Sequence, residues 1–160
     1  MQTVYIETSI PSFYYTLRTD TESIARMHWT RQWWKEYSTK FTLTTSAAVI
    51  DELRQGIGKN TEERIALLDG MDILSITNEV IEIAQIYIDK LVMPKDPQGD
   101  ALHLAIASFY KVDALLTWNC KHIANANKFN HIRRVNFEID LPTPILATPL
   151  NYLTGEDENE

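Results

Sequence analysis

The chain has 160 residues, 44% of them hydrophobic and 23% charged, as is ordinary for a single globular domain with a core of its own. Its formal net charge is −7, but the last six residues, GEDENE, carry four acids and no base, which leaves −3 for residues 1–154. We therefore expect one domain over residues 1–154 and a disordered acidic tail over residues 155–160. The overall charge neither indicates nor excludes a nucleic-acid partner.

The single cysteine, Cys120, excludes an internal disulfide and any zinc cluster built from cysteines. The first residues, MQTVYIETSI, do not form a basic segment followed by an apolar one, and no apolar run approaches 18 residues. These observations favour a protein of the cytoplasm that does not enter a membrane.

Short β-branched or aromatic runs alternate with helical patterns along the chain. The predicted strands are Thr3–Ile6, Phe41–Thr44, Ile73–Ile76, Ala114–Leu116 and Ile145–Ala147. The predicted helices are a short one through Phe13, Tyr14 and Leu17, then Thr21–Tyr37, Ala47–Gln55, Thr61–Leu68, Asn78 to about Leu91, Gly99–Tyr110 and a short one near His122–Asn127. This alternation predicts an α/β fold, with a central parallel sheet between two layers of helices.

Two helices show apolar stripes that are typical of a face packed on a sheet. In the helix that begins at Asn78, capped by that residue, the predicted stripe is Ile81, Ala84, Ile88 and Leu91. In Thr21–Tyr37 it is Ile24, Trp29, Trp33 and Tyr37. Trp34 lies off the second stripe, so we expect it to be an exposed interface residue.

Carboxylates recur at the ends of the predicted strands. Glu7 follows the first strand, Glu52 lies on the helix after the second, and Asp100 opens the helix before the fourth. Because crossovers between parallel strands are right-handed, the carboxyl ends of the strands share one edge of the sheet, where ligands bind in open α/β folds. All three acids can meet there.

Three converging carboxylates repel one another unless a cation lies between them. Mg²⁺ and Mn²⁺ prefer carboxylate oxygen and keep waters that a substrate phosphate can replace. Such a site can carry out phosphoryl transfer. With 22 acids in the chain, however, spacing alone is weak evidence.

Four stretches together resemble the successive motifs of the PIN-domain family, in particular the VapC-like toxins of type II toxin-antitoxin pairs. They are VYIETSIPSFY, VIDELRQG, GDALHLAIA and ALLTWNCKHI, and the similarity runs from Thr3 to about Leu150. The resemblance implies a PIN-like α/β/α fold and an endoribonuclease that depends on Mg²⁺ or Mn²⁺ and leaves a 5′-phosphate and a 3′-hydroxyl. It also implies RNA as substrate, a cognate protein antitoxin and a homodimer.

Matched motif by motif, the family's four acidic positions fall on Glu7, Glu52, Asp100 and Asn119. The resemblance thus makes Glu7, Glu52 and Asp100 the metal ligands and all four residues the catalytic set. Two positions depart from the usual pattern: Glu7 replaces the commoner aspartate, and Asn119 replaces an acid and loses its charge. An amide can still position water, but one tightly bound metal is then favoured over two.

Other roles remain open for several of these residues. Glu7 can be a solvated or helix-capping acid, Asp100 can complement its helix dipole, Asn119 can be a turn residue, and Asp51 competes with its neighbour Glu52 for the site. Polar residues nearby can act as caps, packing residues, bases or donors that orient a ligand: Thr8, Ser9, His103, Thr117 and His122. Arginines and lysines are further candidates for phosphate contacts: Arg18, Lys121, Lys128, Arg133 and Arg134.

Two other functions compete with the ribonuclease. The neutral Asn119 motivates the first, a catalytically weak or inactive PIN-fold module that binds RNA or protein. The second, a receiver-like or nucleotide-binding α/β domain, is disfavoured because a lone Glu7 ends the first strand and no glycine-rich phosphate loop follows any strand.

Overall fold

A computed structural model of the chain describes residues 1–56, 60–95 and 99–153. Five strands form one sheet in the order β3-β2-β1-β4-β5, and every neighbouring pair is parallel. The strands are β1 (Thr3–Ile6), β2 (Thr42–Ser46), β3 (Asp72–Leu74), β4 (Ala114–Leu116) and β5 (Ile145–Ala147). The α/β class expected from the sequence, with a central parallel sheet, is confirmed, and the expected tail over residues 155–160 lies outside the described residues.

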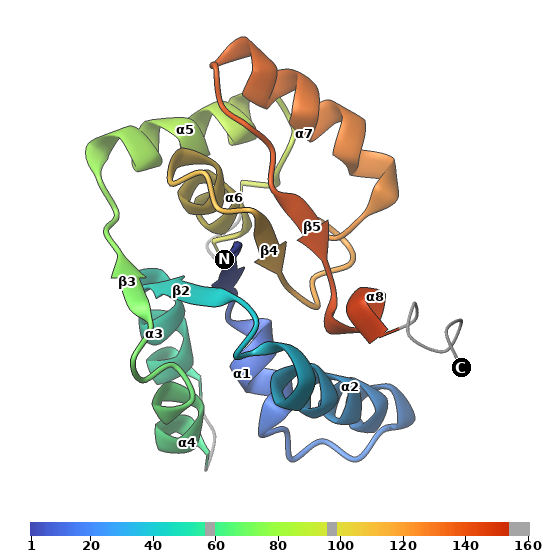
Figure 1. Ribbon diagram of the computed structural model, residues 1–160. Helices are drawn as coiled ribbons and strands as arrows, with labels where there is room; N and C mark the ends of the chain where they lie inside the picture. The colour runs from blue at the N-terminus through green and yellow to red at the C-terminus, as the bar shows by residue number, and fades with distance from the viewer. Residues whose placement is uncertain (57–59, 96–98, 154–160) are drawn as a thin grey trace.

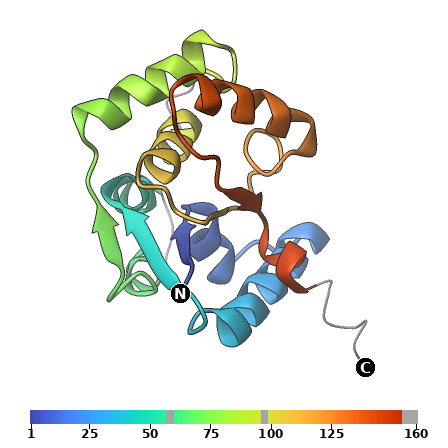
Figure 2. The ribbon, with the colours of Figure 1, turned by 45° about the horizontal axis from the view of Figure 1, so that its top comes forward.

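Helices cover both faces of the sheet (Figure 1). The bounds are α1 (Ser9–Tyr14), α2 (Thr21–Tyr37), α3 (Ala47–Gln55), α4 (Thr61–Ala66), α5 (Asn78–Asp89), α6 (Asp100–Phe109), α7 (Ala126–Glu138) and α8 (Pro149–Leu153). In Figure 1, α5, α6 and α7 lie above the sheet, and the other five lie below it; Figure 2 shows the same grouping from a second direction. None of the described helices is long and apolar enough to cross a membrane.

The centre of the sheet is β1, whose Tyr5 is paired with Thr44 of β2 and with Leu115 of β4. Tyr5 and Leu115 are completely buried, as expected for strands that have helices on both faces. The carboxyl ends of β1, β2 and β4 therefore reach the same edge of the sheet, and the residues after them are brought together.

The predicted stripe of α5 is confirmed only in part, because Ala84 and Ile88 pack against the core but Ile81 and Leu91 do not. The buried residues are Val80, Ile83 and Tyr87, whereas Ile81 is 54% exposed and Leu91, beyond the end of the helix, is 83% exposed. Both stripes repeat at helical spacing. The observed one places the Tyr87 hydroxyl 2.5 Å from Oδ1 of Asn136 in the core, so a buried hydrogen bond accompanies the apolar contact.

The caps and ends of several elements also differ from expectation. The side chain that caps α5 is Thr77, which accepts from the amide of Val80, and not Asn78. The first helix ends at Tyr14, which leaves Leu17 exposed. Strands β2 and β3 are shifted by one residue at their starts, and α4 ends two residues early.

Helix α7 is much longer than the short helix expected near His122–Asn127. It spans 13 residues, and the side chain of Asn125 caps it by accepting from the amide of Asn127. Ile132 and Val135 are buried on its inner face. These two apolar positions among polar residues anchor the helix, and a polar helix held by so few contacts gives a weak sequence signal.

The aromatic stripe of α2 is partly confirmed. Trp33 is completely buried, but Ile24 is 39% exposed at the start of the helix. Trp34 is half-buried and packs edge-on against Tyr14 and Trp33. It is therefore part of the packing between α1 and α2 rather than the exposed residue expected.

Candidate active site

A cavity of about 500 Å³ opens at the carboxyl ends of β1 and β4, beside the start of α1. Its lining includes all four residues that the sequence placed in one site, Glu7, Glu52, Asp100 and Asn119. Hydroxyl, aromatic and backbone groups complete the wall, from Thr8, Ser9, Ser12, Phe13, Gln55, Gly56 and Trp118. The acids that the chain carries 45 to 48 residues apart are thus neighbours in space.

Glu7 is held in place by hydrogen bonds on both sides. Its backbone amide continues the ladder by donating to the carbonyl of Leu116, 3.2 Å away. Its carboxylate oxygens accept from the amide of Ser9, at 3.0 and 2.9 Å, and Oε1 also accepts from the hydroxyl of Thr117 at 2.9 Å. Only 6% of the residue is exposed. The carboxylate therefore caps the start of α1 and also lines the cavity.

Asp100 and Asn119 are joined directly. Nδ2 of Asn119 donates to Oδ1 of Asp100 over 2.9 Å, and Oδ1 of Asn119 accepts from the amide of His122 at 3.0 Å. Because a backbone amide can only donate, the second bond fixes which end of the carboxamide faces Asp100. The neutral residue thus provides a donor to Asp100, which a carboxylate at position 119 would lack.

Glu52 points toward two side chains within the site. Oε2 accepts from the hydroxyl of Thr8 at 2.5 Å, and Oε1 lies 2.9 Å from Nε2 of His103. The neighbouring Asp51 is exposed and does not line the cavity. Of the two adjacent acids, Glu52 is therefore the one that faces the site.

His103 continues this contact into the core. Its Nδ1 lies 2.8 Å from the hydroxyl of Tyr5, which is 2.8 Å from the hydroxyl of Ser46. The residue is 1% exposed. Burial by itself lowers the pKa of His103, but the hydrogen bond and charge of Glu52, with the charges of Glu7 and Asp100, outweigh burial and raise it. Burial has the opposite effect on a tyrosine and raises the pKa of Tyr5.

The sequence could not identify this buried chain of contacts. The sequence leaves a base, a packing residue and an orienting donor as roles for His103, and in the structure it is hydrogen-bonded to Glu52. Tyr5 and Ser46 were missed as polar partners, although a tyrosine within an otherwise aliphatic strand was a possible signal. Thr8 makes no side-chain capping bond to α1 and instead donates to Glu52.

The electrostatics of the cavity favour a cation. Three carboxylates line it, and no lysine or arginine is found in the described lining. Hard oxygen donors of this kind fit Mg²⁺ or Mn²⁺. Within residues 1–56, 60–95 and 99–153, however, no three His, Cys, Asp or Glu side chains stand in a ligand arrangement around one point. Each carboxylate oxygen of Glu52 already accepts or faces one hydrogen-bond partner, Thr8 at Oε2 and His103 at Oε1.

Comparison with known proteins shows a likeness in structure but none in sequence. No family model and no curated protein matches the chain. A solved structure described as VapBC2 from Rickettsia felis, bound to a DNA fragment from their promoter, aligns with a TM-score of 0.58. The alignment covers 92% of this chain and 98% of that chain at 16% identity. At this identity the likeness concerns the fold, and it agrees with the PIN-like fold expected from the sequence.

Proposed function

We propose that the protein is a divalent-metal-dependent endoribonuclease, the toxin of a toxin-antitoxin pair. The observation that carries this proposal is the cavity at the carboxyl edge of the parallel sheet, lined by Glu7, Glu52, Asp100 and Asn119. The ordered motif series in the sequence and the fold shared with a VapBC2 structure support it.

In this proposal Glu7, Glu52 and Asp100 hold Mg²⁺ or Mn²⁺. The bound ion would lower the pKa of a water and neutralise charge on the phosphate. Asn119 keeps Asp100 oriented by donating to Oδ1, and His103 and Thr8 orient Glu52. Attack of water on phosphorus would break the bond to the 3′-oxygen, which leaves as a hydroxyl, and the new bond would give the 5′-phosphate.

The direct test is cleavage of a structured RNA in the presence of Mg²⁺ or Mn²⁺, and in EDTA. We expect cleavage by the unaltered protein only with metal, and a large loss in Asp100→Asn. Asp51→Asn is the matched control, because it removes an exposed carboxylate beside Glu52 without touching the cavity. Equal cleavage by the Asp100 variant and the unaltered protein would remove Asp100 from the site.

The proposal includes a cognate protein antitoxin and a homodimer. The likeness to a VapBC2 structure supports the antitoxin. The protein is co-expressed with the product of an adjacent small gene. Size-exclusion chromatography with light scattering then measures both the binding of that product and the oligomeric state of the protein. A monomer that no such product binds or inhibits would contradict this part of the proposal.

A second candidate is a PIN-fold module that binds RNA or protein without cutting it. Two observations favour it: Asn119 is neutral, and the described acidic side chains are not arranged as a three-ligand set. Calorimetry with Mn²⁺ separates the two functions. Binding that is lost in Glu7→Gln supports the metal-dependent enzyme, whereas no heat of binding supports the module.

A further inference from the structure

A second, smaller pocket adjoins the acidic cavity. It has a volume of about 170 Å³ and is lined by Ser12, Phe13, Thr16, Arg18 and Arg64. Ser12 and Phe13 also line the acidic cavity. The two hollows therefore share a wall formed by α1, with carboxylates on one side of it and arginines on the other.

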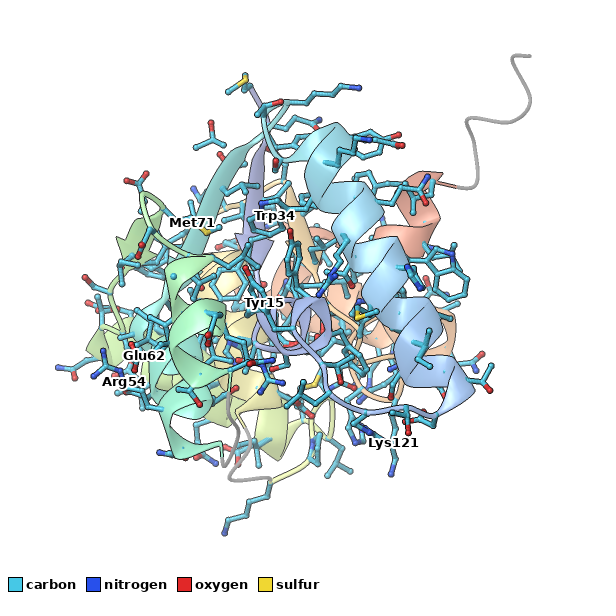
Figure 3. All side chains as sticks on the ribbon, turned by 90° about the horizontal axis from the view of Figure 1, so that it is seen from below. Tyr15, Trp34, Arg54, Glu62, Met71 and Lys121 are labelled. Atoms are coloured by element: carbon cyan, nitrogen blue, oxygen red, sulfur yellow. The ribbon has the colours of Figure 1, made fainter. Side chains whose placement is uncertain are left out.

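Arg64 reaches this pocket from α4. Its Nη2 donates to the carbonyl of Tyr15 over 3.3 Å, at the end of α1. Figure 3 shows Tyr15 between α4 and α2. The Nε of Arg64 is buried and has no hydrogen-bond partner among the described residues. A buried N–H donor without a partner is costly unless something completes its hydrogen bonding.

Arg18 approaches the same pocket from the segment after α1. Its side chain is 71% exposed and makes a 3.4 Å ion pair with Asp20, whose side chain is 49% exposed. Surface pairs of this kind contribute little and exchange readily. No carboxylate is found in the described lining of the pocket, so its electrostatic character is opposite to that of the cavity beside it.

We propose that Arg18 and Arg64 bind a phosphate of the RNA strand next to the one held at the acidic cavity. This inference rests on the proposed function, because it assumes that RNA is the substrate. A chain whose net charge is −7 needs local cations to hold a polyanion. The planar guanidinium of arginine matches the oxygens of a phosphate, and the hydroxyl of Thr16 lines the same pocket. The contact would be with the backbone and would therefore add affinity without sequence preference.

The test measures binding instead of cleavage, so that it is independent of the metal site. A labelled single-stranded RNA is titrated in EDTA, by fluorescence anisotropy, at several salt concentrations. Arg18→Gln and Arg64→Gln should each weaken binding about three- to tenfold, and each should lower the slope of log affinity against log salt by about 0.7. Lys90→Gln, which removes an exposed cation at the end of α5 outside both pockets, should change neither quantity.

Arg64 contacts α1, so its loss can also disturb the fold. Arg64→Lys keeps the charge and should retain most of the salt slope, and thermal melting detects any unfolding. Arg18 is exposed, so the result for Arg18→Gln decides the test. The inference is overturned if this variant keeps the RNA affinity and the salt slope of the unaltered protein, or if the unaltered protein does not bind RNA. The inference is also overturned if Arg18→Gln no longer binds a co-purifying antitoxin but still binds RNA as well as the unaltered protein does. The metal-dependent cleavage assay judges the proposed function separately.

Discussion

Nδ2 of Asn119 donates to Oδ1 of Asp100 over 2.9 Å, while the amide of His122 holds the other end of the Asn119 carboxamide. An aspartate at position 119 would place two carboxylates at this distance. The residue that departs from the acidic pattern of the family that the sequence resembles is therefore a hydrogen-bond donor to Asp100.

Asn119→Asp should destabilise the metal-free protein and increase its response to metal. Replacing a hydrogen bond with a repulsive pair costs about 1–3 kcal/mol at neutral pH. Mn²⁺ should recover that loss if the acids are its ligands. Urea unfolding in EDTA and in Mn²⁺ measures both effects. Asn127→Asp, which adds the same charge at an exposed position of α7, is the control. Equal stability of Asn119→Asp and the unaltered protein in EDTA would contradict the prediction.

Site residues could be predicted where their position follows from the local sequence, but not where it depends on contacts between residues far apart in the chain. Glu7 and Asn119 could be located because each directly follows or closely follows a buried strand, and parallel strands share their carboxyl edge. The partners of Glu52 could not be located in this way. The contact from His103 to Tyr5 joins residues 98 positions apart, and no local pattern specifies which face of α6 meets which residue of β1.

In the fold, too, features set by the local sequence were predicted and features set by tertiary contacts were not. Strands β1, β4 and β5 have the predicted bounds because each is a short apolar or β-branched run between turn residues. The buried face of α5 was predicted only in part because its two apolar stripes are locally equivalent. Tertiary contacts such as the bond from Tyr87 to Asn136 distinguish them, and that information is not contained within the helix.

His103→Phe should lower the free energy of unfolding by about 1–3 kcal/mol, because it removes two ring nitrogens that contact Glu52 and Tyr5 while keeping an aromatic ring. Urea unfolding in EDTA measures this. His28→Phe, at an exposed position of α2, should change stability by less than about 0.5 kcal/mol. If both substitutions have the same effect, the buried hydrogen bonds of His103 contribute nothing net.

Tyr87 should make the fold sensitive to alkali. Burial raises the pKa of Tyr87 to about 12, from 10.0. Because the folded-state pKa exceeds the unfolded-state value, the contribution of this hydroxyl is fully present below pH 10 and is lost as the pH rises toward 12. Tyr87→Phe should be less stable than the unaltered protein at pH 8, and the gap should narrow above pH 10. Melting temperatures over this range measure the gap, and a constant gap would be inconsistent with the raised pKa.

Gly99→Ala should disturb Glu52 specifically. Gly99 has a φ of +82°, and a Cβ there would lie 2.8 Å from Oε1 of Glu52. Gly70 is a matched control, with a φ of +84° and nothing within 4 Å of its Cβ position. Both alanine variants should lose about 1–2 kcal/mol from the left-handed backbone. Gly99→Ala should lose more, because Oε1 must move away from His103.

Removal of the Glu52 side chain isolates this contact. In a Glu52→Ala background the Cβ at position 99 no longer meets a carboxylate oxygen, so Gly99→Ala and Gly70→Ala should have equal costs. Urea unfolding of the single and double variants gives the coupling free energy between positions 52 and 99. A coupling of zero would mean that Glu52 does not occupy the position beside Gly99, and that its orientation toward His103 is not the one the protein adopts in solution.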